Sequence, residues 1–207
     1  MVTWNDFKQE QPALAEAGRG QLYLNGIGLG FLATVRTDGG PRVHPVCPII
    51  STAGLHVLIL PGPKRADLRR DGRYSLHSET VAPPHQDDGF AVSGTAKEIA
   101  DNATWQIVRD QVISDFGELW PEYDTLTLFE LSVASCLLTL TEPADGFPKG
   151  PTIWRAPLAE RPVKREHPPL HAGRRRHDPV PPRRGHRGQV GRVVEDRHRC
   201  DVVQRQV

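Results

Sequence analysis

Sulfur is scarce in this chain, which has three cysteines and one methionine among its 207 residues. Cys47, Cys136 and Cys200 lie far apart, and none of them forms a Cys-x-x-Cys pair. An odd, scattered set of this kind argues against a disulfide framework, and it lacks the spacing of a structural zinc site. We therefore expect reduced thiols, a cytoplasmic protein and no bound metal.

Long apolar runs are also missing. No stretch reaches the ~18 consecutive apolar residues that a membrane span requires. The N-terminal sequence MVTWNDFKQEQ has no basic segment followed by an apolar run, which is the pattern of a secretory signal. The sequence thus predicts neither export nor a membrane partner.

The C-terminal quarter of the chain lacks whole classes of residue. Residues 156–207 contain no Phe, Trp, Tyr, Ile, Met, Ser, Thr or Asn, and they are rich in Arg, Pro, His, Val and Gly. A segment with so few large apolar side chains cannot bury enough area to offset the entropy lost on ordering. We therefore expect a folded domain over residues 1–155 and a disordered Arg- and Pro-rich tail over residues 156–207.

Charge divides at the same place. Residues 1–155 hold 13 Lys and Arg against 19 Asp and Glu, whereas residues 156–207 hold 13 against 6, so the formal charges are −6 and +7. Arginine clusters in the tail attract phosphates, but no aromatic side chain is interleaved with them to stack on bases. Nucleic acid is therefore disfavoured as a partner. Out-of-frame translation of a GC-rich coding sequence would give the same bias, and this origin of the tail is a further hypothesis.

Short apolar segments separated by turn sequences such as DGGP and STAG occupy residues 28–141. This pattern is typical of antiparallel strands, and the first three segments are expected to pair consecutively. Gly94 indicates a bulge or a close backbone approach within its strand. The strands are expected at residues 31–35, 42–50, 55–60, 74–78, 90–99 and 125–141.

Helical patterns accompany these strands. Thr3 and Asp6 form a capping-box pattern, and Pro12 either kinks the helix that starts there or opens a second one, which ends near residues 18–20. A short helix is expected over residues 64–70. Asp101 or Asn102 should cap another helix, whose apolar stripe consists of Trp105, Val108, Val112 and Phe116. The fold class is therefore mainly β with peripheral helices (α+β), arranged as a small antiparallel barrel.

The most informative segment is LHVLILPGPKRADLRRDGRYSL, in which an apolar strand meets a Pro-Gly turn and then a helix start. Lys64 and Arg65 open this helix. Free amides and the dipole of a helix start both favour an anion, and the two cations supply counter-charge. A phosphate site is one interpretation of this turn, and a solvated basic helix start is the other.

Several motifs occur in an order and spacing known from one family: GFLATVRTDGGPRVHPVCPI, then the apolar strand, then GPKRADLRRDGRYSL, then FAVSGTAKEI. Over about residues 20–155 the chain resembles the pyridoxamine 5'-phosphate oxidase-like split-barrel flavoproteins. The resemblance implies a six-stranded antiparallel split β-barrel of the FMN-binding type. It also implies a homodimer that holds the flavin between its subunits and an oxidoreductase acting on a small organic substrate.

The resemblance further implies a set of cofactor-binding residues, although it assigns no catalytic one, because the flavin performs the redox chemistry. Lys64 and Arg65 look like the phosphate pair, and Arg42 looks like a further phosphate contact. The other implied residues are Val43, His44 and Pro45 facing the isoalloxazine ring, Leu58 and Ile59 forming a wall, Ser78 from the fourth strand, and Trp154 and Arg155 near the end of the domain.

Two departures from the family pattern leave alternatives open. Residues 105–141 lack the full set of basic residues expected to bind a substrate phosphate, and residues 115–124 are acidic. True pyridoxamine 5'-phosphate oxidase activity is therefore not expected. FMN is the expected cofactor, and the alternatives are a deazaflavin-dependent reductase and a non-enzymatic flavin- or haem-binding protein.

Overall fold

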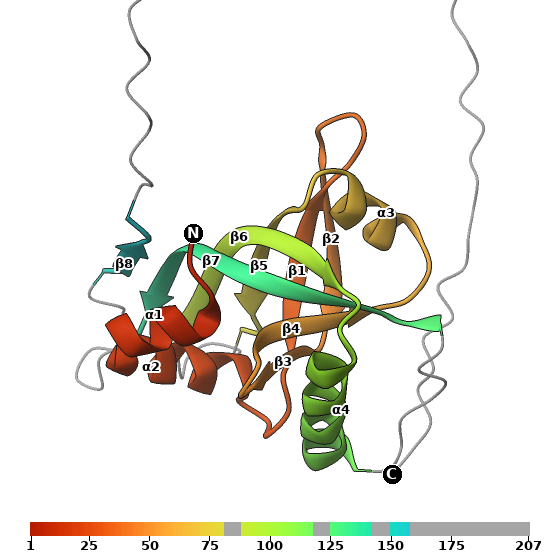
Figure 1. The fold of residues 1–207 in the computed structure, drawn as a ribbon. Coiled ribbons are helices and arrows are strands. Elements are labelled where there is room, and N and C mark those ends of the chain that lie inside the picture. The colour runs from red at the N-terminus through yellow and green to blue at the C-terminus, as the bar shows by residue number, and fades with distance from the viewer. Residues whose placement is uncertain (81–87, 118–124, 142–149, 158–207) are drawn as a thin grey trace, which may run out of the picture. The chain divides into compact units, whose positions relative to one another are not determined.

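The computed structural model describes residues 1–80, 88–117, 125–141 and 150–157, and these residues build one antiparallel sheet with four helices (Figure 1). Seven strands lie in the order β2-β1-β5-β6-β7-β4-β3, and β8 pairs with β7 beside this path. The strands are β1 Gly30–Val35, β2 Pro41–Val46, β3 Pro48–Ser51, β4 Gly54–Ile59, β5 Arg73–Ser78, β6 Gly89–Ile99, β7 Thr127–Thr139 and β8 Thr152–Arg155. The helices are α1 Trp4–Glu10, α2 Pro12–Leu22, α3 Pro63–Arg70 and α4 Asn102–Phe116.

This mainly antiparallel half-barrel with peripheral helices confirms the expected fold class, but the expected count of six strands is wrong. Residues 42–50 divide into β2, which pairs with β1, and β3, which pairs with β4. The two strands therefore lie at opposite ends of the strand order. The expected consecutive pairing is confirmed, because the first segment pairs with β2 and the third pairs with β3. Pro45 and Pro48 lack amide protons, so this segment cannot form one uninterrupted inner strand.

Local sequence chemistry sets the helix boundaries. The Thr3 hydroxyl accepts the Asp6 amide at 3.1 Å, and the Asp6 carboxylate accepts the Thr3 amide at 3.1 Å, so the predicted capping box is confirmed. Pro12 opens a second helix, α2, which continues slightly beyond its expected end. Asp101 caps α4 through the amides of the first turn. None of the helices in the described ranges is long and apolar enough to cross a membrane.

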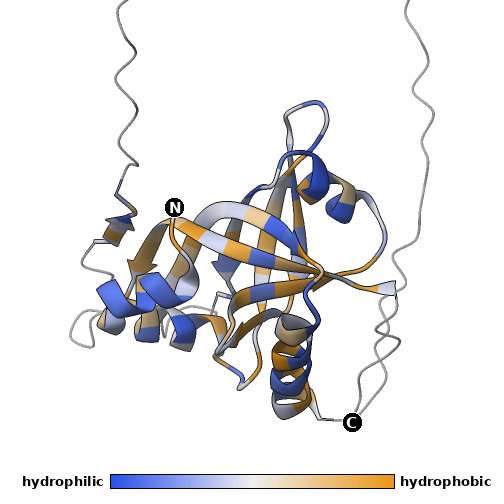
Figure 2. Cartoon of the chain, in the orientation of Figure 1, coloured by the Kyte–Doolittle hydropathy of each residue, from blue (hydrophilic) through white to orange (hydrophobic). Residues whose placement is uncertain are grey.

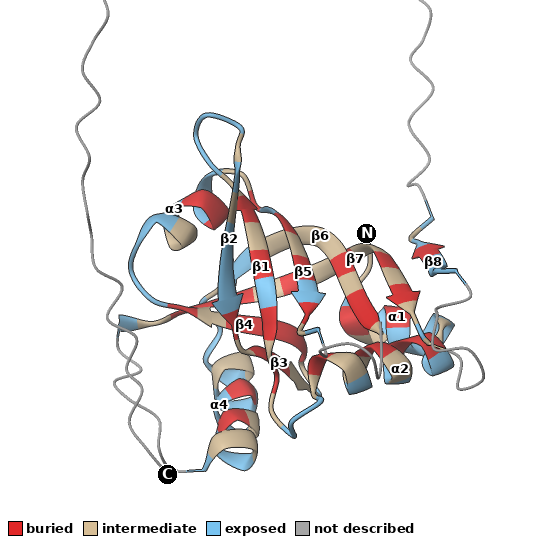
Figure 3. Cartoon of the chain, turned by 180° about the vertical axis from the view of Figure 1, so that it is seen from behind, coloured by how far each residue is buried: buried red, intermediate tan, exposed pale blue. Residues whose placement is uncertain are grey.

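Buried and exposed side chains alternate along the strands, and the buried ones form the core. The buried side chains of Leu32, Leu76, Val92, Cys136 and Trp154 follow one another across β1, β5, β6, β7 and β8. Figure 2 shows apolar and polar residues alternating along these strands, and Figure 3 shows the matching alternation of burial. Helices α1 and α2 add aromatic and aliphatic side chains to this core.

A smaller apolar cluster lies beneath α4. Val108 and Val112 are buried there against Ile49 and Leu128, with the rings of Trp105 and Phe116 packed beside them. The predicted apolar stripe of this helix is thus confirmed.

Gly94 marks the predicted bulge, because the register between β6 and β7 shifts between Ser93 and Gly94. A Cβ atom added to Gly94 would lie 1.7 Å from the Ser132 carbonyl oxygen, so two backbones would have to separate. We expect Gly94→Ala to lower the free energy of unfolding by about 1–3 kcal/mol. Urea denaturation followed by circular dichroism measures this change.

Gly20→Ala is the matched control. Gly20 lies within α2, and apart from its chain neighbours and the backbone of the helix no described atom lies within 4 Å of its added Cβ. The substitution should therefore stabilise the protein by about 0.5 kcal/mol. Equal stabilities of the two variants would contradict the close approach at the bulge.

Candidate cofactor-binding site

The candidate site lies where α3 begins, beside the end strand β2. Gly62 precedes the helix with a φ of 152°, a region that favours glycine. Pro63 follows as the first helical residue, and no side chain caps the helix start. The first turn of α3 therefore keeps the partial positive charge that favours an anion.

Lys64 is half-buried at this helix start. It makes no hydrogen bond or ion pair with any residue that the structure describes. Burial lowers the pKa of Lys64, opposed by its interaction with the Cys47 thiol. Burial raises the pKa of Cys47 despite the charge of Lys64. A half-buried ammonium group without a counter-ion is well suited to bind an anionic ligand.

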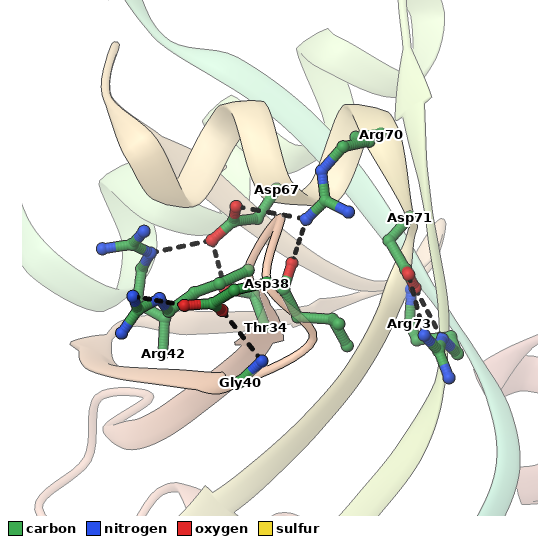
Figure 4. A network of polar contacts seen from close by, with 10 residues as sticks. Thr34, Asp38, Gly40, Arg42, Asp67, Arg70, Asp71 and Arg73 are labelled. Atoms are coloured by element: carbon green, nitrogen blue, oxygen red, sulfur yellow. Dashed lines mark hydrogen bonds and ion pairs between the residues drawn. The ribbon is translucent and has the colours of Figure 1, made fainter. Parts of the chain in front are cut away.

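Arg42 reaches the same area from β2. Its Nε donates a hydrogen bond of 2.7 Å to the carboxylate of Asp67, which is 5% exposed. Figure 4 shows the terminal nitrogens of Arg42 directed away from Asp67, and no described residue pairs with them. Asp67 thus orients Arg42 and leaves its outer donors free for a ligand.

Asp67 connects three elements. Its carboxylate also accepts the Thr34 hydroxyl of β1 at 3.1 Å and an Arg70 nitrogen at 3.4 Å (Figure 4). Arg70 in turn donates to the Val35 carbonyl. Burial alone would raise the pKa of Asp67, but hydrogen bonds from Arg42, Thr34 and Arg70 and the charge of Arg42 hold it below its usual value.

His44 lies on the same side of β2 as Arg42, since residues two apart in a strand share a face. Desolvation and the positive charges of Lys64 and Arg42 lower the pKa of His44. The imidazole is therefore neutral at pH 7, and it can accept or donate one hydrogen bond without adding a third positive charge.

Arg65 takes a different direction from Lys64. Its Nη1 donates to the Thr125 carbonyl at 3.3 Å and to the Thr127 hydroxyl at 3.2 Å. These contacts place Arg65 against the start of β7. Lys64 and Arg65 are adjacent in the sequence, but their side chains therefore lie in different environments.

The remaining predicted residues have varied environments. Val43 and Pro45 are exposed on β2, whereas Ile59 lies in the main core and Leu58 packs on the cluster beneath α4. Ser78 is fully buried, and its hydroxyl accepts the Phe90 amide at 3.0 Å. The structure thus brings Arg42, His44 and Lys64 together, with Val43 and Pro45 on the opposite face of β2.

The two candidates near the end of the domain also differ from each other. Trp154 is buried, its ring centroid lies 4.8 Å from that of Phe7, and its indole nitrogen donates to Glu10 at 3.0 Å. Arg155 is exposed on β8. Trp154 is therefore part of the hydrophobic core. The tail beyond residue 157 lies outside the described residues.

The side of the sheet that faces away from the core is mostly uncharged, and it includes Val43 and Pro45 of β2. We call it the outer face, and it is defined by two rows of cross-strand neighbours. The first row is Pro45, Phe31, His77, Ala91, Leu137 and Ile153, and the second is Val43, Ala33, Ser75, Ser93, Ser135 and Arg155. Most of these side chains are small or apolar, and Val43, Phe31 and Ile153 are 57%, 43% and 49% exposed. Figure 3 shows exposed residues of β2, β1 and β5 from this side.

His77 stands near the middle of the outer face. Its Nδ1 lies 2.7 Å from the Ser78 carbonyl oxygen, which can only accept, so Nδ1 carries a proton. No described residue bonds to Nε2. His77 is exposed, and Nε2 lies beside Gly89, where an added Cβ atom would be 3.5 Å from it.

The fold is known from solved structures. A haem-binding protein from Mycobacterium smegmatis matches 67% of this chain with 14% identity and a TM-score of 0.52, and the chain spans only 57% of that protein's length. An FAD-binding protein from Mesorhizobium loti matches 52% of this chain and 82% of its own, with 24% identity and a TM-score of 0.43. A candidate pyridoxamine 5'-phosphate oxidase from Listeria innocua matches 58% of this chain and 93% of its own, with 13% identity and a TM-score of 0.46.

The match to the haem-binding protein shows that the two chains share a fold. No protein-family model matches the sequence, and no curated protein matches it. At such low identities the likeness shows the fold alone, so the function has to be argued from the residues of this chain.

The Asp67 cluster yields a prediction about stability. Replacing Asp67 with Asn should lower the free energy of unfolding at pH 7 by about 3 kcal/mol, the low end for breaking a buried ion pair, because Arg42 is partly exposed. A carboxyl group whose pKa is lowered on folding stabilises the protein above its unfolded pKa of about 3.9, and this contribution is lost as the pH falls through the folded value. The difference between wild type and variant should therefore shrink below about pH 4.

Chemical denaturation of both proteins at several pH values measures this difference. Asp38→Asn is the control, because Asp38 is an exposed partner of Arg36 and such pairs contribute about 0–1 kcal/mol. A difference between wild type and Asp67→Asn that did not vary with pH would contradict the role of the charged carboxylate.

Proposed function

We propose that this protein binds a phosphorylated flavin, FMN in the first instance, and acts as an oxidoreductase on a small organic substrate. The observation that carries the proposal is the half-buried Lys64, which has no described counter-ion and lies at an uncapped helix start near an Arg42 oriented by Asp67. Two cations and free helix amides form a strong phosphate site.

Each part of the site has a role in this proposal. Lys64 and the outer nitrogens of Arg42 bind the phosphate, and Arg65 adds positive charge behind them. β2 is the last strand in its order, so backbone groups of residues 43–45 along its outer edge remain available to the isoalloxazine ring. Neutral His44 offers one further hydrogen bond. The bound flavin supplies the hydride-transfer chemistry.

A deazaflavin coenzyme in the same site is the alternative within this proposal, and it would make the protein a reductase. Haem binding is the second candidate function, because His77 lies exposed on the mostly apolar outer face and no described residue bonds to its Nε2. Imidazole nitrogens whose other ring N–H is bound to a carbonyl are common metal ligands. In that case the protein would act as a carrier rather than an enzyme.

Lys64→Ala should weaken FMN binding about 10- to 100-fold, the equivalent of losing charge-assisted bonds of about 1.5–3 kcal/mol. Arg65→Ala should have a smaller effect, because Thr125 and Thr127 already hold its guanidinium. Quenching of FMN fluorescence during titration measures both affinities. A parallel titration with haemin, followed by visible absorbance, tests the second candidate.

Lys97→Ala is the control for the loss of one positive charge, because Lys97 is exposed on β6 outside this site. Its FMN affinity should equal that of the wild type. If Lys64→Ala also bound FMN as tightly as the wild type, the phosphate site would be wrong. Tight haemin binding that is lost in His77→Ala, without FMN binding, would favour the carrier.

We further propose that two copies of the chain associate through the outer face. Among the described residues, the two rows of the outer face contain one charged side chain, that of Arg155. Contiguous exposed apolar surface is typical of interaction sites. A self-complementary neutral face suits a twofold dimer, in which the same patch meets itself. Such a dimer would also cover the exposed side chains of Val43 and Pro45 on β2.

Phe31→Lys should convert the dimer to a monomer, because each subunit would bury a new charge at the interface. Leu24→Lys is the matched control, since Leu24 is 41% exposed and lies outside the outer face. Sedimentation velocity distinguishes the two states. A monomeric wild type, or equal dissociation of both variants, would exclude this interface.

A further inference from the structure

A second candidate site is lined mainly by α1 and α2. Figure 1 shows these two helices on the far side of the sheet from α3. A cavity of about 600 Å³ opens there between the two helices and the end of β3, with one residue from α4. Trp4 and Ile50 contribute apolar surface to its lining. This volume is within the range typical of small-molecule sites.

Three charged side chains line the cavity and form no ion pair with any described residue: Lys8 from α1 and Glu16 and Arg19 from α2. Arg19 is held in place, because its guanidinium lies 4.9 Å from the centre of the Tyr23 ring. The Tyr23 hydroxyl in turn accepts the Ile50 amide at 2.9 Å. The cavity therefore presents two positive groups and one negative group on a supported wall.

The side-chain amides of Asn5 and Gln111 also line the cavity, and hydrogen bonds fix their orientation. The Asn5 amide nitrogen donates to the Thr52 carbonyl at 2.9 Å, and no residue of the described ranges bonds to its side-chain oxygen. The Gln111 amide nitrogen donates to Asp115 at 2.8 Å, and the Gln111 oxygen likewise has no partner among the residues that the structure describes. These oxygens can accept N–H groups of a ligand.

We infer that the cavity binds a small dipolar molecule, an amino acid or a short amine-bearing carboxylate. Lys8 and Arg19 bind the carboxylate, since a guanidinium matches its two oxygens. Glu16 binds the ammonium group, and the oxygens of Asn5 and Gln111 take the remaining N–H donors. A simple anion would leave Glu16 as a repulsive neighbour, and a simple cation would face two positive charges.

This inference is independent of the proposed cofactor, because no cavity residue belongs to the Lys64 site. The test uses the full chain and a panel of L-glutamine, L-glutamate and L-lysine at concentrations up to about 10 mM, which detects sites of low millimolar affinity. Two-dimensional ¹H–¹⁵N NMR follows the side-chain amides of Asn5 and Gln111. We expect saturable shifts of these signals with at least one of the three amino acids.

Variants then identify the groups that bind. Arg19→Gln should weaken binding about tenfold or more, whereas Lys97→Gln, which removes a positive charge elsewhere, should leave it unchanged. Glu16→Gln should weaken binding of the amino acid but not of glutarate, which resembles glutamate without its amine. Circular dichroism confirms that each variant keeps its helices.

The outcomes separate the possibilities. Absence of shifts with all three amino acids overturns the inference, and so does binding that Arg19→Gln leaves intact. Equal binding of glutamate and glutarate by the wild type would show a plain anion site and would overturn the dipolar assignment.

Discussion

The contact between Asp67 and Arg42 is the interaction on which the candidate cofactor site depends. Asp67 is buried, so its charge requires partners, and these come from β1, β2 and α3. The same bonds hold α3 against the sheet and fix the direction of Arg42. Without Asp67, Arg42 would lose its one described partner, and α3 would lose its hydrogen bond from Thr34 of β1.

β2 separates the two proposed binding surfaces because alternate residues of a strand point to opposite sides. Arg42 and His44 face α3 and Lys64, whereas Val43 and Pro45 belong to the outer face. A ligand phosphate on the first side and a second copy of the chain on the other can therefore be accommodated together. The backbone edge between them is left for the ring of the cofactor, so cofactor binding and association would reinforce each other.

Features set by nearby residues could be predicted from the sequence, and features set by distant partners could not. The capping box of Thr3 and Asp6 depends on residues three positions apart, and the bulge depends on Gly94. The strand order depends on which distant strands pair with one another, so the division of residues 42–50 into two strands was not predicted. Asp67 was missed for the same reason, since Arg42 lies 25 positions away. One acidic residue among the cations of KRADLRR was the available signal.

The case of Lys64 and Arg65 shows why adjacency in sequence is a poor guide to a shared site on a helix. Successive helical residues are rotated by about 100°, so the two side chains diverge. Lys64 turns towards Cys47 and His44, and Arg65 turns towards β7. Adjacent cations thus place positive charge around the helix start. Thr125 and Thr127 hold Arg65 through its Nη1, whereas no described residue bonds to the Lys64 ammonium group. The proposed phosphate site is therefore better defined by Lys64 and Arg42, which are distant in sequence, than by the neighbouring pair.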